Sequence, residues 1–332
     1  MTPAPASNFS PAQDSAPEQV VFLLVDRFTL LAFSAAIEPL RLANRVSGRR
    51  LYSWRLVSAD GAAARCSTGT EIAVDGGLGE VAQDTLILVC AGLNVQQAVP
   101  VSVLSWLRKC ARHGARIGGL CTGAAVLARA GLLDGVRATI HWENHDAMLE
   151  DYPEVAITKS VFVIDGKRMT SAGGMASLDL MLSLIAARHG SDLANSVADQ
   201  LIYSSIRTNR DTQRLSVPAR IGVRHPKLAR VIDIMERHIE EPIPPAELAQ
   251  DVDMSTRQLE RLFRRYLNRS PKRYYMELRL ERARNLLMQT DMSVINVALA
   301  TGFTSPSHFS KCYRAHYSTT PYRERGTQPA EN

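Results

Sequence analysis

Apolar and polar residues follow two different patterns along this chain. Over residues 19–205, continuous apolar runs of strand length, such as 20–25 and 85–90, alternate with stretches of helical periodicity. Further strands are expected at 51–58, 115–120, 161–164 and 168–171, and helices at 29–44, 101–113, 122–130 and 176–188. Apolar strands separated by helices predict an α/β domain whose mostly parallel sheet is covered on both faces.

A second pattern begins near residue 225 and has helical periodicity throughout. Residues 255–263 and 305–313 each open with a Ser suited to cap a helix, and each carries apolar residues four and eight positions later. A short helix and a turn precede each copy, at 245–251 and 294–301. A short helix, a turn and a second helix form the arrangement that enters a DNA major groove. Residues 225–325 are therefore expected to form an all-α domain with two helix-turn-helix motifs.

The stretch between the two copies predicts one long amphipathic helix over residues 270–289. Ser270 can cap it, and Pro271 occupies the first helical position, where its missing N–H costs nothing. Its apolar positions recur with the spacing of a single buried face: Met276, Leu280, Ala283 and Leu287. About 19 residues span roughly 28 Å, and successive major-groove faces lie about 34 Å apart. Such a helix could hold two reading helices in adjacent grooves.

The polar faces of the two reading helices carry the candidate DNA contacts. In the first copy we expect Arg257, Gln258 and Arg261 to reach bases, and in the second Ser307, His308 and Lys311. Arg264, Arg265 and Arg269 are expected at phosphates, which add affinity without reading sequence. The alternative is a solvated basic surface, but two copies in register are hard to obtain by accident.

The charge of the chain is concentrated in its second half. Of the net +6, residues 205–332 hold 22 Lys and Arg against 14 Asp and Glu, whereas the remainder holds 17 against 19. This distribution favours duplex DNA as a partner. Residues 206–224 contain five arginines and are expected to form the linker between the domains, and residues 1–18 and 326–332 are expected to be tails, the first of them disordered.

Five cysteines without a Cys-x-x-Cys pair argue against a disulfide framework and a structural zinc. No metal or cofactor is expected. The first 18 residues lack the basic start and apolar core of a signal peptide. The longest apolar runs are far shorter than the roughly 20 residues that span a bilayer. A cytoplasmic protein without a membrane partner is expected.

The sequence Gly119-Leu-Cys121-Thr-Gly123 lies where a strand is expected to meet a helix. Small residues around a nucleophile at such a junction form a tight elbow that lifts the side chain above the strand ends. The adjoining helix N-terminus is expected to lower the pKa of the Cys121 thiol.

The last hundred residues resemble the AraC/XylS family of transcription regulators. The resemblance covers residues 226–325 and is carried by Arg279-Leu-Glu-Arg-Ala283, Gly302-Phe303, Ser307-His308-Phe309 and Thr320-Pro-Tyr-Arg323. Members often have Gly after each reading helix, where this chain has Asn268 and Ser318. The resemblance therefore implies a left-handed backbone at these positions, which Asn tolerates better than Ser.

The front domain resembles the PfpI-like branch of the class I glutamine amidotransferase-like superfamily, which implies a flavodoxin-like fold. Glu38 stands where members often have an acid near the cysteine, and His141 lies at a position where some have a nearby histidine. The combined order of domains, with segments 38–44 and 139–144, resembles the GlxA-like subgroup. This implies an amino acid or quaternary amine as effector, which the face of Trp142 and the carboxylates of Glu143 and Glu38 suit chemically.

Three functions are compared for the front domain: a sensor, an enzyme and a scaffold that only dimerises. Hydrolytic members usually carry His directly after the cysteine, whereas this chain has Thr122, so we expect a sensor and not an enzyme. The expected ligand-binding residues are Glu38, Cys121, Thr122, His141, Trp142 and Glu143. The regulator is expected to act as a homodimer and, by resemblance, to activate catabolic genes with RNA polymerase as a partner. The alternatives are a PfpI-like cysteine hydrolase or amidase fused to a DNA-binding domain, and a front domain that only dimerises.

Overall fold

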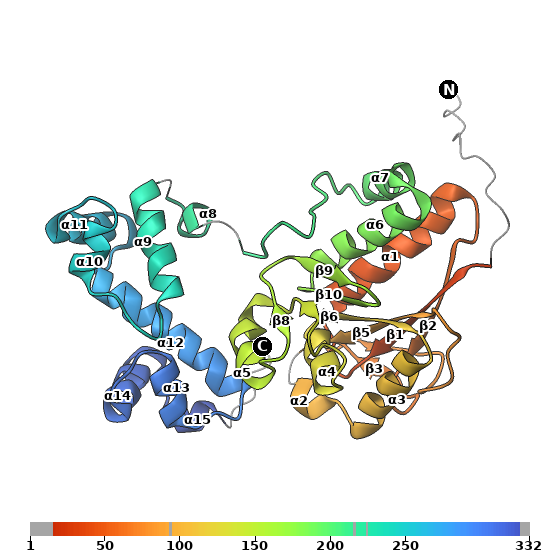
Figure 1. Ribbon diagram of the computed structural model, residues 1–332, viewed down its shortest axis with the longest axis horizontal. Coiled ribbons are helices and arrows are strands. Elements are labelled where there is room, and N and C mark those ends of the chain that lie inside the picture. Colours follow the sequence, from red (N-terminus) through yellow and green to blue (C-terminus); the bar gives the residue numbers. More distant parts are fainter. Residues whose placement is uncertain (1–15, 93–94, 215–216, 224, 326–332) are drawn as a thin grey trace. The chain divides into compact units, whose positions relative to one another are not determined.

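The computed structural model of the protein describes residues 16–92, 95–214, 217–223 and 225–325 (Figure 1). The chain divides into two compact units, one ending at Gln213 and the other beginning at Arg214. The first is an α/β unit and the second is helical. Both fold classes agree with the two patterns of apolar residues in the sequence.

A six-stranded sheet forms the centre of the first unit. Its strands are β1 (Glu18–Leu24), β2 (Tyr52–Val57), β5 (Leu86–Ala91), β6 (Arg116–Cys121), β9 (Phe162–Asp165) and β10 (Arg168–Ser171). They lie in the order β2-β1-β5-β6-β10-β9, and every pair is parallel except β10 with β9. The expected strands and the mostly parallel sheet are therefore confirmed. Two short two-stranded ribbons add to it: β3 (Ala64–Arg65) with β4 (Glu71–Ile72), and β7 (Arg137–Ala138) with β8 (Ala156–Ile157).

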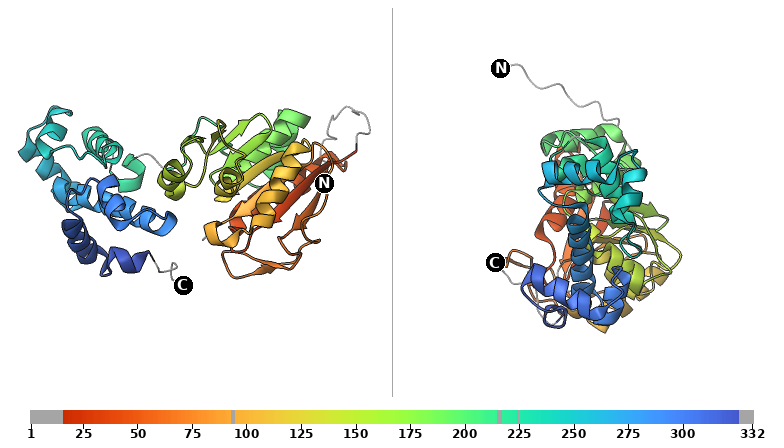
Figure 2. Two further views of the ribbon diagram at one scale, coloured as in Figure 1. Left: turned by 60° about the horizontal axis from the view of Figure 1, so that its bottom comes forward. Right: turned by 90° about the vertical axis from the view of Figure 1, so that its left-hand side faces the viewer.

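Successive residues of the central strands enter two separate cores, because side chains alternate across a sheet. Phe22 packs on one face with α1 (Leu30–Ser47), α6 (Ala176–His189) and α7 (Ser191–Gln200), while Leu23 packs on the other with α3 (Val101–Arg112) and α4 (Gly123–Arg129). Figures 1 and 2 show these two helical layers on either side of the sheet. The shorter elements of this unit are α2 (Val95–Ala98), the 3₁₀ turn η1 (Trp142–Asn144) and α5 (His145–Asp151).

Glycines allow α4 to lie directly against the sheet. A Cβ on Gly123 would lie 2.2 Å from the carbonyl oxygen of Val89, and one on Gly119 would lie 2.5 Å from the amide of Ala124. Neither distance is possible for a real side chain, so the small residues flanking Cys121 are needed for helix–strand packing. They set the position of the junction that holds the cysteine.

The second unit is built from eight helices within the described residues. They are α8 (Val217–Ile221), α9 (Pro226–Arg237), α10 (Pro245–Gln250), α11 (Thr256–Leu267), α12 (Pro271–Gln289), α13 (Val294–Ala300), α14 (Pro306–Tyr317) and α15 (Pro321–Glu324). The pairs α10–α11 and α13–α14 are the two helix-turn-helix motifs that the sequence predicts. α12 runs between the two pairs (Figure 1).

α12 contributes to two cores instead of one. Tyr275 belongs to the core of α9, α10 and α11, whereas Leu280, Ala283 and Leu287 belong to the core of α13 and α14. The Tyr275 hydroxyl also donates a hydrogen bond to the His238 carbonyl at 2.5 Å. The predicted buried face is therefore correct for the second motif but incomplete, because the first turns of the helix pack in another direction.

Left-handed residues end both reading helices. Asn268 after α11 has φ 54° and Ser318 after α14 has φ 58°, so both adopt the conformation that glycine favours. Gly302, between α13 and α14, has φ +74°, and a Cβ there would lie 2.6 Å from the carbonyl oxygen of Ile239. Gly302 thus allows the turn of the second motif to touch the loop that precedes the first.

The expected linker at residues 206–224 needs correction. The first unit continues to Gln213, whose side chain is hydrogen-bonded within it. On the other side, Val217, Ile221 and Val223 pack against the core of α9 to α11. Polar composition suggested a free connection, but most of these residues make contacts inside one unit or the other. None of the helices in the described part of the chain combines the length and the apolar composition that a membrane span requires.

Candidate DNA interface and ligand site

Both reading helices bury their apolar residues and leave the predicted contacts on the surface. In α11, Leu259 and Phe263 are buried, and in α14, Phe309 and Tyr313 are buried. The following residues, which we predict to contact DNA, are all exposed: Arg257, Gln258, Arg261, Arg264, Arg265, Ser307, His308 and Lys311. The fold therefore leaves these side chains available for DNA, although their contacts remain predictions.

The first reading helix begins with a reciprocal cap. The Ser255 hydroxyl accepts a hydrogen bond from the Gln258 amide at 3.3 Å, and the Gln258 side-chain oxygen accepts one from the Ser255 amide at 2.8 Å. Ser305 caps the second helix by accepting from the His308 amide at 3.3 Å. The side-chain oxygen of Gln258 thus has a local role, which leaves Arg257 and Arg261 as the stronger candidates for base contacts.

Two basic residues have roles that we did not predict from the sequence. Arg269, expected at a phosphate, has its Nε 3.1 Å from Glu277 Oε2 and is partly neutralised there. Arg279 donates from Nε to the Thr301 carbonyl at 2.8 Å, and its guanidinium carbon lies 4.1 Å from the Phe303 ring centroid. Arg279 therefore supports the turn before α14, and its position among the apolar residues of α12 was a signal for this role.

Cys121 ends β6 with φ 58°, a conformation rare for a residue other than glycine. Its side chain lies against the chain after β10, since a Cβ on Gly173 would be 2.6 Å from the Cys121 Cβ. The Thr29 hydroxyl donates to its sulfur at 3.5 Å. The predicted elbow is present, but Thr29 and Gly173 come from distant parts of the chain and were not foreseen.

The expected lowering of the thiol pKa is wrong. Burial raises the pKa of Cys121, and the hydrogen bonds from the Thr29 hydroxyl and the Thr122 amide lower it to a smaller extent. The negative charge of Glu143 raises the pKa further. Cys121 is only 8% exposed, so the cost of desolvating the thiolate exceeds the effect of the helix N-terminus.

Neither Thr122 nor His141 serves as a hydrogen-bonded base for the Cys121 thiol in the described part of the chain. The Thr122 hydroxyl donates to the Gly92 carbonyl at 2.7 Å, which ties the helix start to the end of β5. No hydrogen bond joins His141 to Cys121 among these residues. A neutral, buried thiol without a base is poorly equipped for nucleophilic attack.

His141, Trp142 and Glu143 form a compact polar group near the thiol. His141 Nδ1 lies 3.7 Å from Glu143 Oε2, and the His141 ring centroid lies 5.7 Å from that of Trp142. Burial lowers the pKa of His141, and Glu143 partly offsets this. Trp142 is half-buried and not a core residue. The influence of Glu143 on the thiol pKa links this group to Cys121.

Glu38 does not join that group. Its carboxylate accepts hydrogen bonds from Arg41, three residues later on α1, at 2.6 and 2.9 Å, and its side chain is 43% exposed. Thr29, which touches the thiol, precedes Glu38 by nine residues, or about 13 Å of helix. The expectation that Glu38 is an acid near Cys121 is therefore wrong, because α1 carries Glu38 away from the end of β6.

The segment from Tyr203 to Gln213, which we call the tether, was missed as part of the site. The Gln213 side-chain amide donates to the Ile140 carbonyl at 2.9 Å, directly before His141, and to the Thr139 hydroxyl at 2.8 Å. The tether is also held by Asp179, a fully buried carboxylate that accepts hydrogen bonds from the Tyr203 hydroxyl and from Arg207. It thus links the end of the first unit to the residues beside the thiol.

Comparisons with known proteins agree with both units. A model of the DJ-1/PfpI family matches residues 18–187, and a model described as a helix-turn-helix domain matches residues 248–326. The HTH-type transcriptional regulator CdhR of Pseudomonas aeruginosa is 48% identical over 93% of this chain and 91% of its own length. The HTH-type transcriptional regulator GlxA of Rhizobium meliloti is 38% identical over 92% and 94%.

A solved structure supports the same assignment. An AraC family transcriptional regulator from Pseudomonas putida is 30% identical, with a TM-score of 0.50, and the match covers 56% of this chain and 100% of that one. Relatives that span nearly the whole chain are transcriptional regulators, which supports DNA binding over enzymatic activity. The chain therefore belongs to the AraC-type helix-turn-helix transcriptional regulators that carry a DJ-1/PfpI domain ahead of the DNA-binding domain.

Proposed function

We propose that the first unit senses a small quaternary amine or amino acid beside Cys121, and that binding controls transcription of catabolic genes through the second unit. The observation that carries this is the half-buried Trp142 next to Glu143, close to a thiol whose pKa is raised by burial. An aromatic face and a carboxylate suit a cation that cannot donate a hydrogen bond. A sensor must release its ligand unchanged, and an inert thiol fits that requirement.

On the DNA side, each chain presents two reading helices joined by α12, with Arg257 and Arg261 as base contacts and Arg264 and Arg265 at phosphates. His308 and Lys311 contribute from α14, with Ser307 beside them. A homodimer would then cover paired half-sites. The ligand is proposed to favour one arrangement of the dimer, which activates transcription by RNA polymerase. Such an effect requires different affinities for the two arrangements.

Ligand-dependent melting of the full-length protein tests the sensor. Glycine betaine, choline and arginine would be added separately, and at least one should raise the melting temperature of the first unit, because a ligand that binds the folded state stabilises it. Trp142→Leu and Glu143→Gln should remove the shift. Trp54→Leu, at another half-buried tryptophan of the same unit, should preserve it. A shift that survives both site variants, or no shift with any of these compounds, contradicts the proposal.

Base reading by Arg261 is tested by binding to a selected operator and to single-base variants. Arg261→Ala should cost about 1–3 kcal/mol and relax specificity at one base pair. Arg265→Ala should instead weaken all sequences alike and reduce the salt dependence of binding. A uniform loss for Arg261→Ala would reassign that residue to a phosphate.

A further inference from the structure

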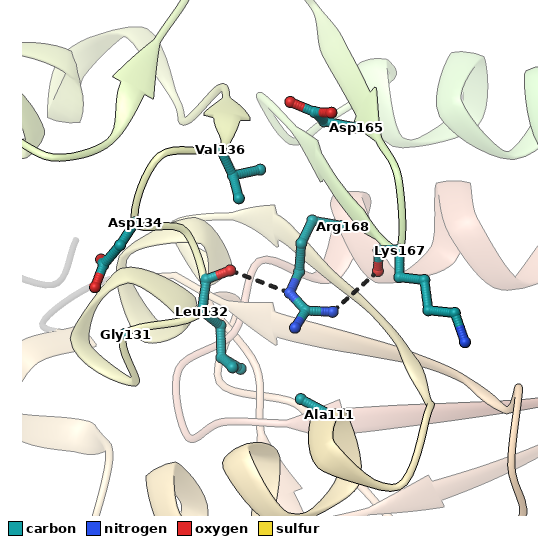
Figure 3. A pocket seen from close by; sticks show the side chains of 8 residues that line it. All are labelled: Ala111, Gly131, Leu132, Asp134, Val136, Asp165, Lys167 and Arg168. Carbon is teal, nitrogen blue, oxygen red and sulfur yellow. Dashed lines mark hydrogen bonds between the residues drawn. The ribbon is translucent and has the colours of Figure 1, made fainter.

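A hollow of about 440 Å³ opens in the first unit, where the ends of α3 and α4 meet the β9–β10 hairpin (Figure 3). Its lining includes Arg168, with Ala111, Leu132 and Val136 as apolar walls. In the sheet, Arg168 pairs with Ile117, four residues before Cys121 on β6. Four residues of strand span about 13 Å, so the hollow lies near the amino-terminal ends of β6 and β10, whereas the thiol lies at the carboxyl-terminal end of β6.

Arg168 is the charged group at the centre of this hollow. Its Nε donates to the Leu132 carbonyl at 3.1 Å and its Nη1 to the Lys167 carbonyl at 3.3 Å. Both partners are neutral backbone groups, and among the described residues no carboxylate pairs with Arg168. The second terminal nitrogen, Nη2, has no acceptor among the described residues. A half-buried guanidinium in this state retains unused donors for an anion.

The neighbouring charged side chains are engaged elsewhere. Lys167 Nζ lies 3.2 Å from Asp84 Oδ1 and donates to the Gly114 carbonyl at 2.9 Å. Asp165 Oδ2 accepts a hydrogen bond from the Arg137 amide at 3.0 Å. In Figure 3 the Lys167 and Asp134 side chains point away from the Arg168 guanidinium. The positive charge facing the hollow therefore belongs to Arg168.

We propose that this hollow binds a small organic monocarboxylate, separately from the amine site beside Cys121. The open edge of the guanidinium matches a carboxylate, and the apolar walls suit a short hydrocarbon body. The exposed carboxylate of Asp134 at the rim disfavours a second negative charge on the ligand, which selects against phosphate dianions.

Titration calorimetry of the full-length protein with 3-methylbutanoate tests the site. Saturable binding is expected, with no binding of the neutral 3-methylbutanamide and weaker binding of inorganic phosphate. Ala111→Asp, which adds a negative charge to the wall, should weaken binding roughly tenfold or more, about 1.4 kcal/mol. The isosteric and neutral Ala111→Asn should bind nearly as well as the parent, which separates charge repulsion from loss of fold.

Arg168→Gln supplies a second check, with circular dichroism confirming that the variant folds. Folded Arg168→Gln should not bind 3-methylbutanoate. Equal binding of the acid and its amide, equal binding of phosphate, or no effect of Ala111→Asp would each overturn the proposal. Glu143→Gln should leave carboxylate binding unchanged, and Ala111→Asp should leave the amine-dependent melting shift unchanged, so the two sites can fail independently.

Discussion

At the residue scale, Cys121 combines a left-handed backbone with deep burial, and these properties have separate causes. The backbone follows from a strand that turns at once into α4, whose Gly123 packs against Val89. The burial follows from Thr29 and the loop at Gly173 closing over the sulfur. Such strained conformations persist only where the surroundings enforce them. The elbow is thus retained although the thiol pKa is raised and not lowered.

Alkylation should reveal this difference. With iodoacetamide at pH 7.5, the half-buried Cys312 should react well before Cys121, because the thiolate is the nucleophile and Cys121 is both buried and protonated. Peptide mass spectrometry over time would give each rate, and mild urea should accelerate the reaction of Cys121 toward the rate of Cys312. Preferential labelling of Cys121 at pH 6 would instead indicate an activated nucleophile and favour the hydrolase alternative.

His141 should make the first unit sensitive to acid. Its pKa lies below 6.5 in the folded chain because burial disfavours the charged ring. Between that lowered pKa and 6.5 the unfolded chain binds a proton that the folded chain does not, so stability falls as the pH falls through this window. Urea unfolding from pH 7.5 to 5 should show less pH dependence for His141→Gln. Glu143→Gln should increase the pH dependence, because it removes the charge that supports protonation; a decrease would contradict this account.

At the scale of elements, the strands and caps were predictable because their signals are local. A continuous apolar run such as 85–90 indicates a doubly covered strand, and Ser255 with Gln258 indicates a capped helix. α7 was not predicted, because its buried Ala194 and Ala198 are small and give a weak pattern. The site was predicted only in part, since the contact of Thr29 with Cys121 joins residues 92 positions apart.

An ion pair joins the tether to α6. Arg207 Nη2 lies 2.7 Å from the fully buried carboxylate of Asp179. Arg207→Ala should destabilise the first unit by about 2–3 kcal/mol in urea unfolding, less than a fully buried pair would lose because Arg207 is partly exposed. The double variant Asp179→Asn with Arg207→Ala should recover part of the loss. A double variant less stable than Arg207→Ala alone would show that the buried charge is not the cause.

For the whole molecule, the tether is the covalent route from the proposed sensor to the DNA-binding unit. It ends at Gln213, whose side chain donates to Ile140 beside the His141–Glu143 group, and the second unit begins one residue later. A ligand that moves the His141–Glu143 group would therefore also move Gln213, the last residue of the first unit.

Gln213→Leu should keep operator affinity and the ligand-dependent melting shift but reduce ligand-dependent transcription several-fold, because ligand binding and transcription are no longer coupled. Gln200→Leu, an exposed position at the end of α7, serves as the matched control. Reporter assays would measure ligand-dependent transcription with both variants. Full ligand-dependent induction with Gln213→Leu would rule out the tether as the route from the sensor to the DNA-binding unit.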